Sequence, residues 1–261
     1  MSAFRAGDDA DADADADADA GGGPPQGARP VLDLTADMLD DTPVDPRVEF
    51  ERGMSYLAPA TLAIMGLCAG AFGWQLASGA LESDEAVIAS GAMVTERLLR
   101  GEAWRLVSAM FLHGGLEHLL GNMVALYILG LGCEHAFGSV PMLGIYALAG
   151  IVGGLASAAV LPAPTLGASG AIFGLMGCVV AMLARRRRQL HVRDGRIGIV
   201  LAVWAVFQLA MGFLSPRVAN MAHLGGLLAG AALGWWLEPR LLREAAGGSQ
   251  PRTSASTSSE T

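Results

Sequence analysis

The sequence predicts an all-α membrane protein, a bundle of six transmembrane helices with a membrane-associated outer loop between the first two. Three observations support this. Of the 261 residues, 52% are hydrophobic and only 16% are charged, whereas about a quarter of a soluble domain is charged. Apolar runs of about 20 residues recur, which is the length needed to cross a bilayer core of about 30 Å. The acidic charge is also concentrated at one end, since 14 of the 25 acidic residues precede Arg52.

The chain divides into three parts. Residues 1–50 contain an Asp-Ala alternation from Asp11 to Ala20, and their high charge and few large apolar side chains predict a disordered acidic tail. Residues 51–240 form the helical domain. Residues 241–261, rich in Ser and Thr from Gly247 onward, are expected to form a second disordered tail. The three cysteines lie in apolar runs and indicate small buried residues, not a disulfide framework.

Six apolar runs are the expected spans, and arginines set their orientation. The runs are Ala58–Ala80, Leu116–Cys133, Pro141–Leu161, Ser169–Ala184, Ile197–Leu214 and Ala219–Leu237. Short cytoplasmic loops carry an excess of Lys and Arg, and the loop after the fourth run holds six arginines between Arg185 and Arg196. Both termini are therefore expected in the cytoplasm. The long outer connection, residues 81–115, is expected to fold at the membrane interface, anchored by Trp104 and Arg105.

The fourth run is too short for a full span. Its 16 residues from Ser169 to Ala184 would cover about 24 Å as a helix. Arginines fix its inner end, so Ser169 is expected below the outer surface, preceded by non-helical backbone at Pro162–Gly167. Such backbone is tolerated at membrane depth only where protein buries it or water reaches it. We therefore expect a water-accessible cavity open to the outside.

Ser169 and His223 are the expected reactive pair. Polar side chains inside a membrane are costly and mark functional candidates. Ser169 and Gly170 begin the fourth run, and His223 shares a helix face with Gly226 and Gly230, a small-residue spacing that lets helices touch. Close packing would bring the hydroxyl within reach of the imidazole, which could activate it as a nucleophile. Two alternatives stay open: an ordinary N-cap serine, and a helix contact without chemistry.

His118 and Asn122 are candidate oxyanion donors. They are four residues apart, so they project from the same face of the second run. Together with the Ser169 backbone N–H they could meet the negative charge that develops in acyl transfer; interhelical hydrogen bonding is the alternative. We expect no metal site and no cofactor, because no HExxH pattern and no Cys/His/Asp cluster with ligand spacing is present.

The combined pattern resembles the rhomboid family of intramembrane serine proteases, in its six-helix bacterial form. The motifs are Glu102-Ala103-Trp104-Arg105, His113-x4-His118-x3-Asn122, Gly167-x-Ser169-Gly170 and Ala222-His223-x-x-Gly226-x3-Gly230. The resemblance covers about Tyr56 to Pro239.

The resemblance implies roles for individual residues. Ser169 and His223 would form a dyad without an acidic third member, and Phe173 would stack on the His223 ring. His118, Asn122 and backbone N–H groups would line the oxyanion hole. Trp104 and Arg105 would belong to a membrane-embedded outer loop, Glu134 would stabilise the inner end of the second helix, and Ser215–Asn220 would cap the site beside a gating fifth helix.

The expected function is therefore endoproteolysis of single-span membrane proteins near the outer leaflet of a bacterial inner membrane. The site would face the periplasmic or extracellular side, and the partners would be these substrates and the lipid bilayer, not nucleic acid. No oligomeric state is indicated. A proteolytically inactive relative that binds clients is the main alternative. A transporter is disfavoured because no internal repeat is seen and the polar groups crowd one side, and an aspartyl protease because Asp84 and Asp194, the aspartates beyond the acidic tail, lie in loops.

Overall fold

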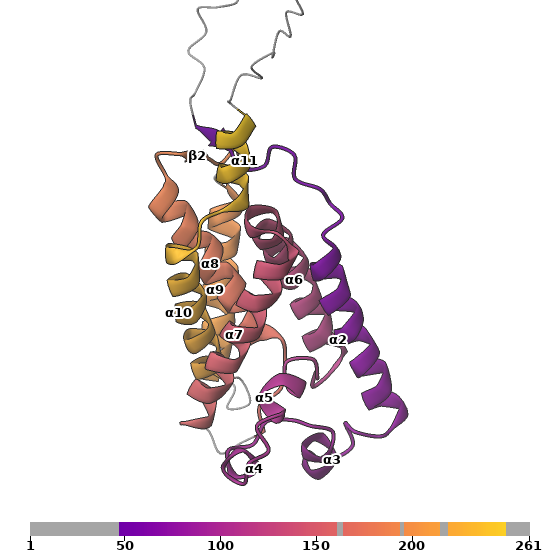
Figure 1. Ribbon diagram of the computed structural model, residues 1–261. Helices are drawn as coiled ribbons and strands as arrows, with labels where there is room; N and C mark the ends of the chain where they lie inside the picture. Colours follow the sequence, from indigo (N-terminus) through magenta and orange to yellow (C-terminus); the bar gives the residue numbers. More distant parts are fainter. Residues whose placement is uncertain (1–46, 161–163, 194–195, 215–218, 249–261) are drawn as a thin grey trace, which may run out of the picture. The chain divides into compact units, whose positions relative to one another are not determined.

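The computed structural model describes residues 47–160, 164–193, 196–214 and 219–248, and its regular structure is almost entirely helical (Figure 1). The helices are α2 (Pro59–Ala77), α3 (Asp84–Ala89), α4 (Thr95–Leu99), α5 (Arg105–Ser108), α6 (Leu116–Phe137), α7 (Ser139–Ala158), α8 (Ser169–Arg186), α9 (Arg196–Leu214), α10 (Asn220–Trp236) and α11 (Arg240–Gly248). The short strands are β1 (Val48–Glu49) and β2 (Leu190–His191). The predicted all-α class is confirmed.

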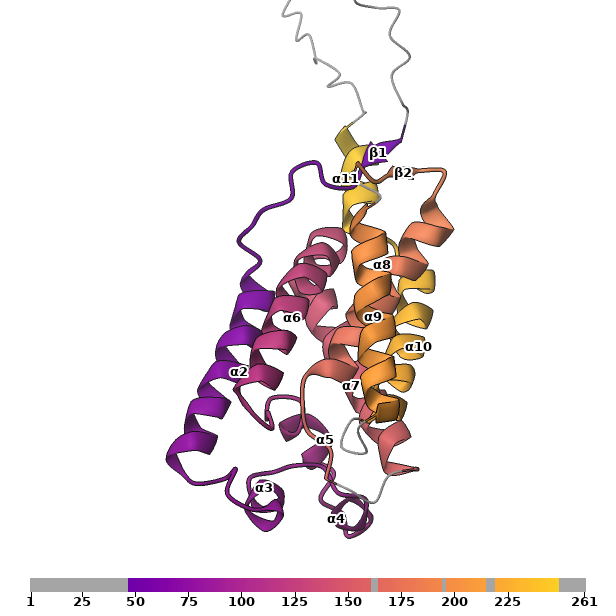
Figure 2. The same cartoon turned by 180° about the vertical axis from the view of Figure 1, so that it is seen from behind.

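Six of these helices coincide with the six apolar runs and lie side by side as a bundle (Figures 1 and 2). Within the described residues, α2, α6, α7 and α8 are long and apolar enough to cross a membrane. Helices α9 and α10 have 19 and 17 residues, and the count of six spans stays a prediction. Helix α7 begins two residues before the predicted run because Pro141 falls in its first turn, where proline lacks no helical hydrogen bond.

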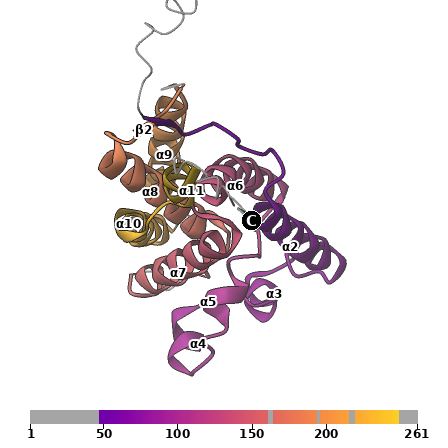
Figure 3. The same cartoon turned by 45° about the horizontal axis from the view of Figure 1, so that its top comes forward.

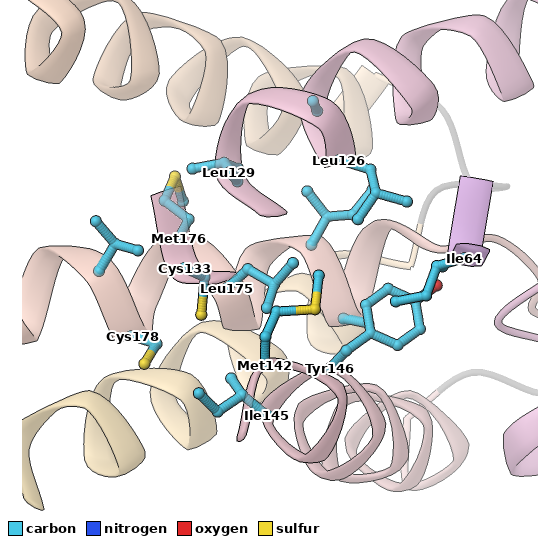
Figure 4. Packing of buried hydrophobic residues seen from close by; sticks show 14 of the residues in the cluster. Ile64, Leu126, Leu129, Cys133, Met142, Ile145, Tyr146, Leu175, Met176 and Cys178 are labelled. Atoms are coloured by element: carbon cyan, nitrogen blue, oxygen red, sulfur yellow. The ribbon is translucent and has the colours of Figure 1, made fainter. Parts of the chain in front are cut away.

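Helix α8 lies at the centre of the bundle, against α6, α7 and α10 (Figure 3). In the apolar 18-residue segment of α8, 61% of the residues are buried, against 33–39% in the corresponding segments of the other three long apolar helices. Leu175 and Met176 of α8 meet side chains of α6 and α7, among them Leu129 and Ile145 (Figure 4). Outward-facing positions are apolar too, as at Leu120, Val124 and Ile128 of α6, which are 55%, 63% and 44% exposed. A helix that is apolar on all sides suits a lipid environment.

Helices α8 and α10 touch through their backbones. A Cβ atom built on Gly226, Gly230 or Gly234 would overlap the carbonyl oxygen of Gly170, Gly174 or Cys178, respectively. The three glycines on α10 are spaced by four residues and so form one stripe. Any larger side chain in this stripe would force the helices apart. The contact face predicted from the glycine spacing is confirmed.

The outer connection between α2 and α6 folds into the three short helices α3, α4 and α5. It is tied to the segment before α8, since Met93 and Thr165 exchange backbone hydrogen bonds of 2.9 and 2.8 Å. The expected anchoring by Arg105 is wrong: its guanidinium is buried and donates to the Ile88 and Ala92 carbonyl oxygens, at 2.6 and 3.0 Å. A buried cation needs such partners, and Arg105 therefore holds this segment together from inside. Trp104 is 53% exposed.

At the opposite end of the bundle, regular structure extends into both of the predicted tails. Residues 48–50 do not belong to a disordered tail, because β1 pairs in parallel with β2 and Phe50 is buried. Residues 241–248 are helical as part of α11, with Leu241 buried. Short amphipathic segments of this kind lack the long apolar runs by which the spans were recognised, and long-range contacts hold them.

Glu134 joins three helices at this end. Its carboxylate accepts the backbone N–H groups of Ala60 and Thr61 at 3.0 and 2.9 Å and the Thr61 and Ser139 hydroxyls at 2.8 and 2.7 Å. It therefore caps the N-terminus of α2, which has no side-chain cap of its own. Its negative charge also interacts favourably with the positive end of that helix dipole. The expected role at the inner end of α6 extends to α2 and α7.

Candidate active site

Ser169 is the first residue of α8, at the end of the bundle where α3, α4 and α5 lie. The chain reaches it through Gly167, whose φ of +125° favours glycine. A Cβ atom on Gly167 would also come within 2.8 Å of the His118 ring. Ala168 occupies the N-cap position and no side chain caps the helix. The alternative reading of Ser169 as an ordinary N-cap serine is therefore wrong.

The Ser169 hydroxyl lies against the imidazole of His223 from α10. Oγ of Ser169 and Nε2 of His223 are 2.8 Å apart. The contact follows from the glycine packing, because Gly170, which adjoins Ser169, touches through its backbone Gly226, which lies one helical turn after His223. The structure thus brings together the hydroxyl and imidazole that the sequence paired.

Aromatic stacking holds the His223 ring. The Phe173 ring lies parallel to it, with centroids 4.4 Å apart and an interplanar angle of 9°. Trp204 of α9 packs on Phe173 at 5.3 Å. Nδ1 of His223 is buried and has no hydrogen-bond partner among the described residues. Within the part of the chain that the structure describes, no carboxylate orients this ring, and the stack does so instead.

His118 presents its other edge to the turn that carries Ser169. Its Nδ1 accepts a hydrogen bond of 3.3 Å from the Gly114 N–H, so a neutral imidazole carries its proton on Nε2. Nε2 lies 3.0 Å from where a Cβ atom on Gly167 would be. A hydrogen-bond donor thus points into the space next to Ser169.

Asn122 lies one turn further along α6 and is buried. Its Nδ2 donates to the His118 carbonyl oxygen at 2.9 Å, within the same helix and not between helices as the alternative reading held. One Nδ2 hydrogen remains unused, because a carboxamide carries two. Oδ1 has no partner among the described residues.

The cluster is partly exposed. Ser169 and His118 are half-buried, whereas His223 and Asn122 are buried. An incoming group could thus reach the hydroxyl while the base stays shielded. Chemically, the arrangement offers a hydroxyl with an adjacent base and N–H donors nearby, which suits nucleophilic attack on a carbonyl.

Other predicted residues lie outside this cluster. Gly230 packs α10 on α8 deeper in the bundle, and Trp104 and Arg105 belong to the outer connection. Of the expected cap, positions 215–218 lie outside the described residues. Within the described ranges no group of three His, Cys, Asp or Glu side chains is placed to hold a metal ion.

Two groups near the site were given no role by the sequence. Trp204 is one of three aromatic residues within a long apolar run. His113 is buried, its backbone N–H donates to Oε1 of Gln75 at 3.0 Å, and its ring lies 5.2 Å from that of His118. A buried glutamine in the first run was the available hint, because such a side chain needs a partner.

The fold and this cluster define a multi-pass membrane protein with a serine–histidine pair between two helices. A family model, the Rhomboid domain, matches residues 100–240, which is more than half of the chain. The chain belongs to the rhomboid family.

Curated relatives agree with this assignment. The chain is 38% identical over 161 residues to rhomboid protease GluP of Bacillus subtilis (strain 168), covering 60% of this chain and 31% of that protein. It is 38% identical over 152 residues to RHOMBOID-like protein 5 of Arabidopsis thaliana, covering 56% and 48%. With the putative rhomboid protease YdcA of Bacillus subtilis the identity is 35% over 135 residues, covering 51% and 66%. The matched segment is thus less than half of the first two relatives.

Proposed function

We propose that this chain is an intramembrane serine endopeptidase that cleaves single-span membrane proteins. The observation that carries the proposal is the 2.8 Å contact between the Ser169 hydroxyl and the His223 imidazole, found in a chain of the rhomboid family. Two relatives are named as rhomboid proteases, one of them putatively. Together, the Ser169–His223 contact and the family membership favour acyl transfer to Ser169.

In the proposed reaction, Oγ of Ser169 attacks the carbonyl carbon of the scissile peptide bond. Nε2 of His223 takes the hydroxyl proton and then gives it to the leaving amine. The acyl-enzyme that remains is hydrolysed by water, which His223 deprotonates in turn. Phe173 keeps the imidazole in place throughout, since Nδ1 has no partner to do so.

The negative charge on the carbonyl oxygen would be met by Nε2–H of His118, the free Nδ2 hydrogen of Asn122 and the Ser169 backbone N–H. The last of these points out of the first turn of α8, where helical N–H groups have no intrahelical partner. The positive end of the helix dipole adds to the stabilisation. An oxyanion at this point would thus have several donors.

We place the site on the periplasmic or extracellular side of a bacterial inner membrane, with both termini in the cytoplasm. Arginines gather at the α11 end of the bundle, in residues 185–193 and 240–243, and Ser169 begins α8 at the other end. The positive-inside rule supports this orientation. A single-span substrate would have to unwind locally to expose its backbone to Ser169.

The test is cleavage of a model single-span substrate by purified protein. Ser169→Ala and His223→Ala should each lower turnover by about 10⁴-fold or more, as for other serine hydrolases. Ser78→Ala, at an exposed serine beyond the end of α2, is the matched control and should cleave normally. Equal cleavage by all variants would rule out the dyad.

The oxyanion donors are tested separately. His118→Ala and Asn122→Ala should each lower kcat by about 10²- to 10³-fold with little change in KM. Leu120→Ala, at an exposed position of the same helix, should have little effect. Unchanged kcat in the first two variants would contradict the proposed roles.

The second candidate function is that of an inactive rhomboid-like protein that binds membrane clients, a possibility that the name RHOMBOID-like leaves open. A fluorophosphonate probe separates the two, because it reacts only with an activated serine. Labelling that disappears in Ser169→Ala supports the protease. Client binding without any labelling would support the alternative.

A further inference from the structure

A hollow of about 540 Å³ lies at the arginine-rich end of the bundle, far from Ser169 along α8. It is lined by Ala184, Arg185, Arg187, Arg188 and Trp235. Its volume is in the range of small-ligand sites. Three guanidinium groups around one hollow would repel one another and favour an anionic occupant.

Two arginines at this end of α8 already have partners within the protein. Arg186 forms an ion pair with Glu238. Arg185 donates to the Trp235 carbonyl oxygen and lies over the Trp235 and Trp236 rings, at 5.3 and 5.5 Å from their centroids. Its position is thereby fixed.

Arg187 and Arg188, by contrast, are exposed, and their guanidinium groups make no hydrogen bond or ion pair with any residue that the structure describes. A guanidinium has five N–H donors in a planar fork that matches phosphate oxygens. The hollow thus combines one immobilised arginine with two whose donors are unused.

The surface next to the hollow is apolar in the direction of the bundle centre. Val180 is one turn before Ala184 on α8 and is 54% exposed, and Leu228 is two turns before Trp235 on α10 and is 61% exposed. Tryptophan side chains such as Trp235 prefer the level of the lipid headgroups. Cationic groups at headgroup level with exposed apolar side chains below them match an amphiphile, not a small free anion.

We propose that this hollow binds the phosphate headgroup of an anionic phospholipid, whose acyl chains run along α8 and α10. The guanidinium groups of Arg187 and Arg188 contact the phosphate, while Arg185 and Trp235 form the wall against which it packs. The site is separate from the proposed proteolytic one and does not depend on it.

The experiment uses the full-length protein in detergent, supplied with equal amounts of phosphatidylglycerol and phosphatidylcholine, with retained lipids counted by native mass spectrometry. The wild type should retain phosphatidylglycerol preferentially. The double variant Arg187→Gln/Arg188→Gln should reduce this preference about 25-fold, because each arginine near a lipid surface contributes about five-fold. Arg187→Lys/Arg188→Lys should recover part of it, since the charge is restored.

The matched control is Arg97→Gln/Arg100→Gln, which removes the same charge from exposed arginines of the outer connection. It should keep the wild-type preference, and all variants should have the melting temperature of the wild type. If Arg187→Gln/Arg188→Gln unfolds, Arg187→Lys/Arg188→Lys is compared with the wild type instead. Equal preference for phosphatidylglycerol in these two proteins overturns a guanidinium site. Absence of preference in the wild type, or equal loss in the control, overturns the proposal. Displacement of the lipid by excess inorganic phosphate would assign the hollow to a free anion instead and overturn the lipid.

Discussion

The Phe173 ring lies flat on the His223 ring, with 4.4 Å between their centroids and 9° between their planes. This contact takes the place of the acidic partner that orients the histidine in a Ser-His-Asp triad. The imidazole is fixed by shape, and its Nδ1 is left without a described partner.

Replacing Phe173 by Leu should therefore lower kcat by about tenfold or more with little change in KM. Leucine fills much of the volume but offers no flat surface, so the imidazole can tilt away from Ser169, and small displacements in an active site cost rate steeply. Phe173→Tyr keeps the ring and is the control. Steady-state kinetics on the model substrate measure both; equal kcat for the Leu variant and the wild type would show that the stack is not needed.

The glycine contact between α8 and α10 can be tested at Gly226. Gly226→Ala places a Cβ on the Gly170 carbonyl oxygen, which forces the helices apart and should destabilise the protein by about 1–3 kcal/mol. Activity should fall at the same time, because Ser169 and His223 separate. Thermal unfolding and cleavage assays report the two effects.

Gly144→Ala is the matched control, since a Cβ there has open space around it. It should leave activity unchanged and slightly raise stability, because alanine favours helices more than glycine does. If Gly226→Ala behaved like this control, the close backbone contact would be refuted.

Removing the Glu134 carboxylate should loosen the end of the bundle at which α2 begins. Glu134→Ala leaves the Ala60 and Thr61 N–H groups without their acceptor, and buried unpaired donors cost about 1–3 kcal/mol each. The melting temperature should fall clearly. Glu117→Gln, at an exposed position of the same helix, should leave it unchanged, and an equal effect of both variants would count against the capping role.

Acidification should destabilise the protein partly through His113. Burial, with a smaller contribution from the nearby His118, lowers the pKa of His113 to about 4, against about 6.5 in an unfolded chain. Between these values the unfolded chain binds the proton and the folded one does not, so stability falls as the pH drops from about 6.5 to about 4. Above this window His113 contributes no pH dependence.

His113→Gln cannot titrate and should show a smaller loss of melting temperature between neutral and acidic pH than the wild type. The comparison within each variant removes the effect of the substitution itself. An identical pH dependence in the two proteins would mean that His113 is not protonated on unfolding in this range.

Sequence patterns predicted the parts of the fold that depend on local periodicity. The apolar runs matched the bundle helices to within a few residues, and the glycine spacing identified the α8–α10 contact that joins Ser169 to His223. The length of an apolar run and the spacing of small residues are local properties of the chain, so a single sequence is enough to recognise them.

Contacts between distant segments were harder to predict. Nothing local to Met93 indicates its pairing with Thr165, and the inward direction of Arg105 depends on the carbonyl groups that the folded outer connection places around it. The stacking of Trp204 on Phe173 similarly requires that α9 pack beside α8. Such features follow from tertiary packing, which overrides what short segments favour.

The backbone contact between Gly170 and Gly226 has a consequence for how this protein can diverge. Main-chain atoms and not side chains set the spacing between the two helices. The distance between the Ser169 hydroxyl and the His223 imidazole therefore does not depend on substitutions elsewhere on the helix surfaces. Lipid-facing positions such as Val180 and Leu228 are therefore free to adapt to membranes of different composition and thickness. Drift at those positions would leave the reactive pair in register.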